Sequence, residues 1–188
     1  VMKQSPNEVL KAGSPTLAGT IAQTLADPQA DHFVEDDTHF LKSHGIYQQD
    51  DRDVRKTGKQ YIFMVRCRIP GGLLGPAQYL VCDDLATRYA NNTLRVTSRQ
   101  GFQWHGVVKG GLRALVKEIN DALLGTLAAC GDVNRNVMAP PTPAMNKLGE
   151  RVQEHTQQVA AALLPRTRAY HSIWIDGVSL DLEERRLA

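Results

Sequence analysis

The sequence lacks the features that would point to a membrane, secreted or nucleic-acid-binding protein. Its 188 residues contain no apolar run long enough to span a bilayer, and no compact apolar core follows a basic start as in a secretory signal. The formal net charge of +2 is too small to indicate a nucleic-acid or membrane partner by itself. We therefore expect a cytoplasmic globular protein of about one domain, with no membrane or nucleic-acid partner.

Cysteine is also scarce. Cys67, Cys82 and Cys130 are far apart and form no C-x-x-C pair, which fits a reducing compartment. We expect Cys82 and Cys130 to be small buried hydrophobes. His44 lies near several aspartates within residues 40–53, but this stretch lacks the regular alternation and glycine of a calcium loop. A surface loop with local Asp–Arg pairs is the better interpretation, and we predict no metal ligand in this chain.

Residues 93–106 have the pattern of two short strands joined by a tight turn. Apolar and polar side chains alternate in both strands, so one face is apolar and the other is polar. Gly101 suits a turn that needs a positive φ. The polar face carries Arg95, Thr97, Gln103 and His105. Such a face is costly to bury unless an anion covers it, so the hairpin predicts either a ligand with several negative charges or a solvated sheet face.

The surrounding elements predict an α+β fold. A strand over residues 60–68, a helix over residues 76–89, the hairpin and a helix over residues 110–123 follow in the order β-α-β-β-α. With one more strand this is the ferredoxin-like βαββαβ pattern, whose two helices cover one sheet face and leave the other open. Arg66 and Arg68 have the same strand parity, so we expect both to join the hairpin's polar side chains on the open face.

The flanking segments carry weaker signals. Residues 16–25 suggest a short helix within an arm that lies over the body, and residues 170–177 suggest a strand. Thr142 and Pro143 suit the cap and first position of another helix. Its expected buried stripe consists of Met145, Leu148, Val152, Val159 and Leu163.

Four segments in register carry a family resemblance: GIYQQDDRD at 45–53, VRCRIPGG at 65–72, LRVTSRQGFQWHG at 94–106 and CGDVNRNV at 130–137. Together they resemble the N-terminal part of assimilatory sulfite reductase hemoproteins, in the sulfite and nitrite reductase family that uses sirohaem and a [4Fe–4S] cluster. The resemblance covers roughly residues 37–177. Its motifs are more similar to those of sulfite than of nitrite reductases.

The resemblance assigns roles to the polar face. Sirohaem carries many carboxylates around its rim, and arginines hold carboxylates with paired, charge-assisted hydrogen bonds. Arg66 and Arg135 match arginines that face the open side of the sirohaem iron and bind the substrate anion, where they would stabilise charge on its oxygens. The residues that match sirohaem contacts are Arg95, Thr97, Ser98, Arg99, Gln103 and His105.

The resemblance also implies an organisation and partners. Residues 1–59 would be an N-terminal arm and polar loop, residues 60–138 a ferredoxin-like half-domain with the sirohaem-facing sheet, and residues 139–188 the truncated start of a second sirohaem-binding α/β domain. The family reduces sulfite to sulfide by six electrons, taken from ferredoxin or an NADPH flavoprotein. The family's cluster cysteines and active-site lysines have no match here. We therefore expect the [4Fe–4S] cluster only in the full-length enzyme, and an inactive fragment that needs the second half-domain.

Other functions remain possible from the sequence. Nitrite reduction in the same family is one. An anion- or RNA-binding ferredoxin-like module is another, with Phe102 and Trp104 as stacking platforms, although their parity places them on the helix-covered face. An isolated half-domain would expose a sheet edge and an apolar seam, which predicts self-association of this chain, for example as a homodimer.

Overall fold

The structure is a computed structural model that describes residues 4–14, 16–56, 58–131, 133–141 and 145–175. No helix within these ranges is both long and apolar enough to cross a membrane. The elements in order are α1 (Pro6–Gly13), α2 (Ile21–Ala26), α3 (Glu35–Ser43), β1 (Ile46–Asp50), β2 (Tyr61–Arg66), the 3₁₀ turn η1 (Pro70–Gly72), α4 (Pro76–Tyr89), β3 (Leu94–Val96), β4 (Phe102–Val107), α5 (Lys109–Asp121), α6 (Lys147–Ala162) and α7 (Ala169–Trp174).

The four strands form one antiparallel sheet in the order β1-β2-β4-β3. The β-α-β-β-α order expected from the sequence is confirmed as β2, α4, β3, β4 and α5. The remaining edge strand is β1, which comes before this unit in the chain rather than after it and pairs with β2 from Ile46↔Val65 to Asp50↔Tyr61. The α+β ferredoxin-like expectation therefore holds, with the additional strand supplied from the N-terminal side.

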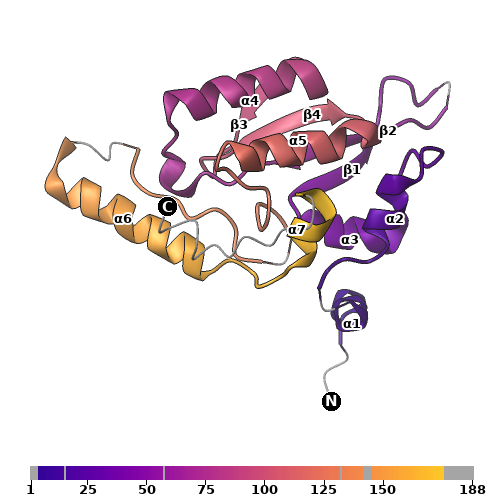
Figure 1. The fold of residues 1–188 in the computed structure, drawn as a ribbon, viewed down its shortest axis with the longest axis horizontal. Coiled ribbons are helices and arrows are strands. Elements are labelled where there is room, and N and C mark those ends of the chain that lie inside the picture. The colour runs from indigo at the N-terminus through magenta and orange to yellow at the C-terminus, as the bar shows by residue number, and fades with distance from the viewer. Residues whose placement is uncertain (1–3, 15, 57, 132, 142–144, 176–188) are drawn as a thin grey trace.

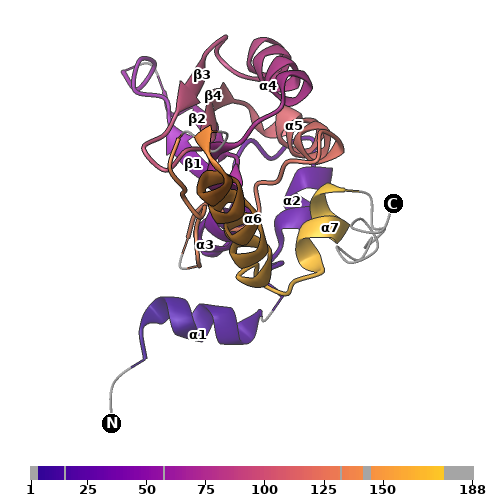
Figure 2. The same cartoon turned by 90° about the vertical axis from the view of Figure 1, so that its left-hand side faces the viewer.

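Helices α4 and α5 lie together on one side of the sheet, as Figure 2 shows. Trp104 of β4 is fully buried on this side, and its Nε1 donates a hydrogen bond to the carbonyl oxygen of Cys82 in α4 at 3.0 Å. The apolar stripe of α5 is also fully buried at Leu112, Leu115 and Ile119. These contacts fix which sheet face is covered by helices, and they leave the polar side chains on the opposite face.

The sequence suggested that residues 40–53 form a surface loop, and this interpretation is wrong. They comprise the end of α3, a turn at Gly45 and the edge strand β1. His44 is fully buried, and Gly45 has a φ of +83° while its carbonyl oxygen accepts a hydrogen bond from the Arg66 N–H at 2.8 Å. One expected local pair does form, since Arg55 Nε lies 2.7 Å from a carboxylate oxygen of Asp50. A polar composition is compatible with a strand at a sheet edge, where one side of the ladder meets solvent.

The C-terminal segment also differs from expectation. Residues 169–174 form helix α7 rather than a strand, and residues 176–177 of the predicted strand lie outside the described ranges. Helix α7 packs against α5 and buries Tyr170 and Trp174. Aromatic and β-branched residues favour a strand locally, but tertiary packing decides the conformation of so short a segment.

Helix α6 has the predicted apolar stripe but does not bury it. Met145 and Leu148 are 76% and 71% exposed, and Val159 and Leu163 are also exposed. The buried face is polar instead, since Gln153 Nε2 donates to the carbonyl oxygen of Gly71 in η1. The helix begins after Asn146, whose side chain accepts a hydrogen bond from the Gly149 N–H; the predicted cap at residues 142–143 lies outside the described ranges.

Two expectations for the β3–β4 hairpin were wrong, one about Gly101 and one about Val96. The positive φ of +56° belongs to Gln100, whereas Gly101 has none. Gly101 is required for another reason, because a Cβ there would lie 2.6 Å from the carbonyl oxygen of Cys67. Val96 was expected on the buried apolar face, but it is 70% exposed at the sheet edge.

The N-terminal helices also differ from expectation. The helix predicted at residues 16–25 is shorter, and α1 and α3 carried no clear sequence signal. Helix α1 lies apart from the sheet in Figures 1 and 2.

Candidate functional site

Three polar side chains form a row across the open face of the sheet. Arg66 on β2 pairs with Gln103 on β4, and Gln103 pairs with Arg95 on β3. Directly opposed residues in neighbouring strands project to the same face about 5 Å apart. The predicted gathering of these three residues is therefore confirmed. Arg68 does not join them: it is buried, and its Nη2 donates to the carbonyl oxygen of Ala160 in α6 at 2.9 Å.

The guanidinium of Arg66 is held from two sides. Its Nη1 lies 2.7 Å from Sγ of Cys130, which in turn lies 2.7 Å from the Tyr47 hydroxyl. On the other side, with the Gln103 amide oriented to satisfy its neighbours, Oε1 of Gln103 accepts from Nε and Nη2 of Arg66 at 2.8 and 2.5 Å. The amide nitrogen of Gln103 then donates to Nε2 of His105 at 3.2 Å. Cys130 is buried as expected, but its thiol has polar partners.

His105 lies half-buried at the end of this hydrogen-bonded chain. Burial lowers its pKa below the ordinary value of 6.5, and the nearby positive charges of Arg95 and Arg66 lower it further. A neutral imidazole has a lone pair on one nitrogen, which is what the donating Gln103 amide requires. His105 therefore adds a hydrogen-bonding group to the face without adding a third positive charge beside Arg95 and Arg66.

A cavity of about 140 Å³ lies beside this row. It is bounded by the β3–β4 turn, by Arg66 and by the loop that follows α5. The Thr97 hydroxyl accepts a hydrogen bond from the Gly101 N–H at 3.1 Å, so it closes the turn as well as facing the cavity. The predicted site residues that line the cavity are Arg66, Thr97, Ser98, Arg99 and Arg135. Arg95, Gln103 and His105 lie beyond its edge, along the sheet.

Two residues whose role the sequence did not reveal fasten the cavity walls together. The side-chain amide of Gln100 donates to the Ala139 carbonyl at 2.7 Å and accepts from the Ala139 N–H at 3.1 Å. Asn136, only 7% exposed, donates from Nδ2 to the carbonyl oxygens of Ile69 and Arg99, each at 2.8 Å. These bonds link the loop of Arg135 to the turn of Arg99. The asparagine's ability to bind backbone groups was foreseeable, but its partners are distant in sequence.

The face carries positive charge that no carboxylate neutralises among the described residues. Arg66, Arg95, Arg99 and Arg135 have no ion pair there, whereas Arg55 and Arg88 do. Arginine is protonated at all ordinary pH values, so four guanidinium charges remain around the cavity and the sheet face. The donor set therefore fits an anionic ligand with several carboxylates, as the rim of sirohaem has, and also a small oxyanion. Within the described ranges, no three His, Cys, Asp or Glu side chains form a possible metal site.

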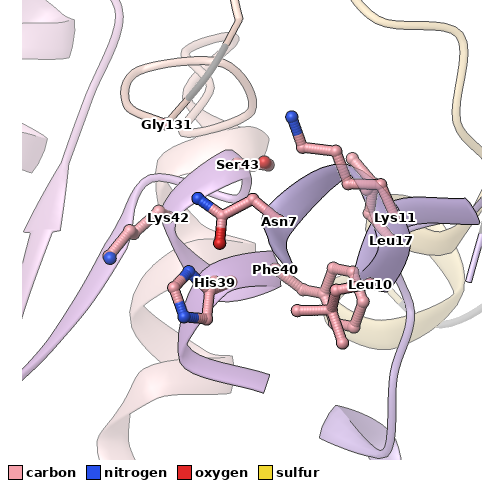
Figure 3. Close-up of a pocket in the computed structure, with 9 residues that line it drawn as sticks. All are labelled: Asn7, Leu10, Lys11, Leu17, His39, Phe40, Lys42, Ser43 and Gly131. Carbon is pink, nitrogen blue, oxygen red and sulfur yellow. The ribbon is translucent and has the colours of Figure 1, made fainter. Parts of the chain in front are cut away.

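A second, smaller cavity of about 60 Å³ lies between α1 and α3. Figure 3 shows Asn7 and Leu10 from α1 opposite His39 and Phe40 from α3. None of the residues predicted from the sequence to bind a ligand lines it. We therefore take the cavity beside Arg66 as the candidate site.

Comparison with known proteins is consistent with this geometry. Residues 54–122 match the model of the nitrite/sulfite reductase ferredoxin-like half domain. Residues 54–122 are thus similar to this half domain. The match covers β2, α4, β3, β4 and α5, the unit that builds the open face. The family resemblance inferred from the four sequence motifs is thereby confirmed.

Curated relatives extend the similarity over most of the chain. The sulfite reductase [NADPH] hemoprotein beta-component of Staphylococcus epidermidis is 45% identical over 95% of this chain and 32% of the relative. The proteins of the same name from Myxococcus xanthus and Geobacillus kaustophilus are 48% and 49% identical over 89% and 90% of the chain. The chain thus spans about a third of the length of these relatives.

A solved structure supports the fold. The NirA protein of Mycobacterium tuberculosis superposes with a TM-score of 0.68 over 85% of this chain and 32% of that protein. At 21% sequence identity this similarity concerns the fold alone.

The alternative of an RNA-binding module does not fit the structure. The two aromatic residues proposed to stack on bases are not accessible, because Phe102 is 9% exposed and Trp104 is fully buried under α4 and α5.

Proposed function

We propose that this chain supplies part of the sirohaem- and sulfite-binding site of a sulfite reductase, an oxidoreductase that reduces sulfite to sulfide by six electrons. The observation that carries the proposal is the group of four arginines around the open face and its cavity, none paired with a described carboxylate. The names of the relatives favour sulfite over nitrite and an NADPH-linked partner subunit over ferredoxin.

In this proposal the sheet face and the β3–β4 turn would hold the rim carboxylates of sirohaem. Arg95 and Arg99 are exposed and can each donate two parallel N–H groups to one carboxylate. Thr97, Ser98 and neutral His105 add uncharged hydrogen-bonding groups around them. Gln103 would keep one amide N–H for sirohaem, because its oxygen accepts from Arg66 and its nitrogen donates once, to His105. It also shapes the face through those two neighbours.

Arg66 and Arg135 both line the cavity and would hold the sulfite anion there. Bound sirohaem would supply the iron that takes the sulfur and passes electrons to it. The two arginines remain protonated throughout, so they stabilise negative charge on the sulfite oxygens and do not act as proton donors. The [4Fe–4S] cluster and the proton-donating groups of the full reaction would come from other parts of the enzyme, so this chain alone should not complete the reduction.

The proposal is tested by titrating sirohaem into the chain and following its absorption spectrum. Arg95→Gln and Arg99→Gln should each weaken the binding about tenfold or more, because a charge-assisted hydrogen bond contributes roughly 1.5–3 kcal/mol. The matched control is Arg113→Gln, which replaces an exposed arginine on α5, in the helix layer on the other side of the sheet. It should leave the affinity unchanged.

Two outcomes would reject the proposal. One is that sirohaem does not bind to the folded chain at all. The other is that it binds with the same affinity to all three variants, because the arginines of the open face would then not be what holds it.

A further inference from the structure

Three residues from separate parts of the chain meet behind the cavity: Tyr47 on β1, Arg66 on β2 and Cys130 in the loop after α5. Cys130 Sγ is 2.7 Å from Arg66 Nη1 and 2.7 Å from the Tyr47 hydroxyl. The guanidinium also lies over the Tyr47 ring, 5.8 Å from its centre. Cys130 is fully buried, whereas Tyr47 and Arg66 are half-buried, so the contact joins the interior of the fold to the open face.

The backbone holds Cys130 firmly in this place. The Ala128 N–H donates to the Ser43 carbonyl and the Arg68 N–H to the Gly125 carbonyl, each at 2.8 Å. A Cβ on Gly45 would lie 2.3 Å from the Thr126 carbonyl oxygen. The loop after α5 is therefore packed tightly between the α3–β1 turn and the end of β2, and the thiol has little freedom to move away from Arg66.

We propose that Cys130 and Tyr47 are positioning residues that fix the direction of the Arg66 guanidinium toward the cavity. This inference rests on the proposed function, in which Arg66 holds the oxyanion. Neither residue touches the anion in this arrangement. Each acts through Arg66 alone.

A count of donors shows what the arrangement achieves. A guanidinium has five N–H groups. Cys130 takes one on Nη1, and Gln103 takes Nε–H and one on Nη2. One N–H on each terminal nitrogen remains, which matches two oxygens of a single oxyanion. The side chain is thus anchored while keeping a pair of donors for the ligand.

The chemical nature of the anchors also matters. A carboxylate in place of Cys130 would hold Arg66 more strongly, but it would neutralise the charge that attracts the anion. A thiol and an amide accept hydrogen bonds and leave the positive charge intact. The Cys130 thiol can donate its own proton to the Tyr47 hydroxyl while it accepts from Arg66. Burial and the neighbouring Cys130 raise the pKa of Tyr47, so the phenol also stays neutral.

The direct test is the Arg66 Nε–Hε signal in ¹⁵N NMR spectra of the ligand-free chain, identified by its loss in Arg66→Lys. Cys130→Ala and Tyr47→Phe should shift and broaden this signal, because the guanidinium loses an anchor. Cys130→Ser keeps a donor and an acceptor and should restore a sharp signal. Cys82→Ala is the matched control, since it removes a buried thiol that has no contact with Arg66.

A sulfite titration of the same variants gives the functional consequence. Cys130→Ala and Tyr47→Phe should weaken sulfite binding about tenfold, and neither should weaken it further in an Arg66→Lys background. A merely structural role would lower the unfolding midpoint of Cys130→Ala and Cys82→Ala alike without this dependence on Arg66.

The outcomes separate the two claims. If the Arg66 signal of Cys130→Ala and Tyr47→Phe equals that of the wild type and of Cys82→Ala, the positioning inference is wrong, whatever the sulfite affinity. If the signal changes but Arg66→Lys binds sulfite as well as the wild type, the positioning holds and the proposed role of Arg66 in holding sulfite fails instead.

Discussion

Acidification should destabilise the fold through one buried histidine. His44 is fully buried between α3 and β1, and its Nδ1 accepts a hydrogen bond from Trp174 Nε1 of α7 at 2.9 Å. The rings of Tyr170 and Trp174 meet it edge-on. Burial alone lowers the pKa of His44 from 6.5 to about 4. The site therefore accepts only the neutral imidazole at neutral pH, and the bond from Trp174 requires it.

The size of the effect follows from this pKa difference. In the unfolded chain His44 takes up a proton near pH 6.5, whereas in the folded chain it does so only near pH 4. Between these values the unfolded state binds more protons, so the free energy of unfolding falls as the pH falls. The contribution of neutral His44 to the free energy of unfolding is fully present above pH 6.5. About 2 kcal/mol of it is lost by pH 5, and roughly 3 kcal/mol is lost below pH 4.

Urea unfolding at several pH values between 7.5 and 4.5 measures this loss. His44→Gln should be less stable at neutral pH, but its stability should depend less on pH than that of the wild type by about 2 kcal/mol at pH 5. His155→Gln is the control, because it replaces an exposed histidine on α6 and leaves the buried surroundings of His44 intact. An equal pH slope for wild type and His44→Gln would refute the reasoning.

Two further predictions concern packing, and both are measured by urea unfolding. Gly101→Ala should cost roughly 1–3 kcal/mol, because its Cβ would lie 2.6 Å from the Cys67 carbonyl oxygen. Gly110→Ala, with nothing within 4 Å of a Cβ, should not destabilise, and a similar cost in both variants would contradict the explanation. Leu148→Gln on the exposed stripe of α6 should change stability by less than about 0.5 kcal/mol. A loss of several kcal/mol would show that this stripe is covered within the chain.

The elements that the sequence predicted well are those with a strong local period. The bounds of α4 agree with the predicted helix, and the buried stripe of α5 agrees at Leu112, Leu115 and Ile119. The row of Arg66, Gln103 and Arg95 could also be foreseen, because alternation along a strand decides which face a side chain takes. Only the strand pairing, which the ferredoxin-like pattern supplies, was needed to bring the three together.

The errors arose where the partner of a segment decided its structure. Strand β1 is polar because it is an edge strand, and α7 is helical because its aromatic side chains pack onto α5 and His44. On α6 the period was interpreted correctly as a helix with an apolar face, but the wrong face was assigned to the interior. Gln153 and Ala160 face the body instead, because Gln153 donates a hydrogen bond to the carbonyl oxygen of Gly71 and Ala160 accepts one from the guanidinium of Arg68.

The candidate site shows the same division between local and long-range information. Its positive charge is visible in the sequence, because no acidic residue alternates with the arginines of the β3–β4 hairpin. The residues that anchor Arg66 are not visible in the sequence. Cys130 lies 64 residues from Arg66 and 83 residues from Tyr47 in the chain. Neutral anchors carry no signal of charge complementarity, and a buried cysteine is as well explained by packing. Positioning residues that leave the charge of an arginine available for an anion are therefore not recognisable from sequence patterns. They are identified from the contacts in the folded chain.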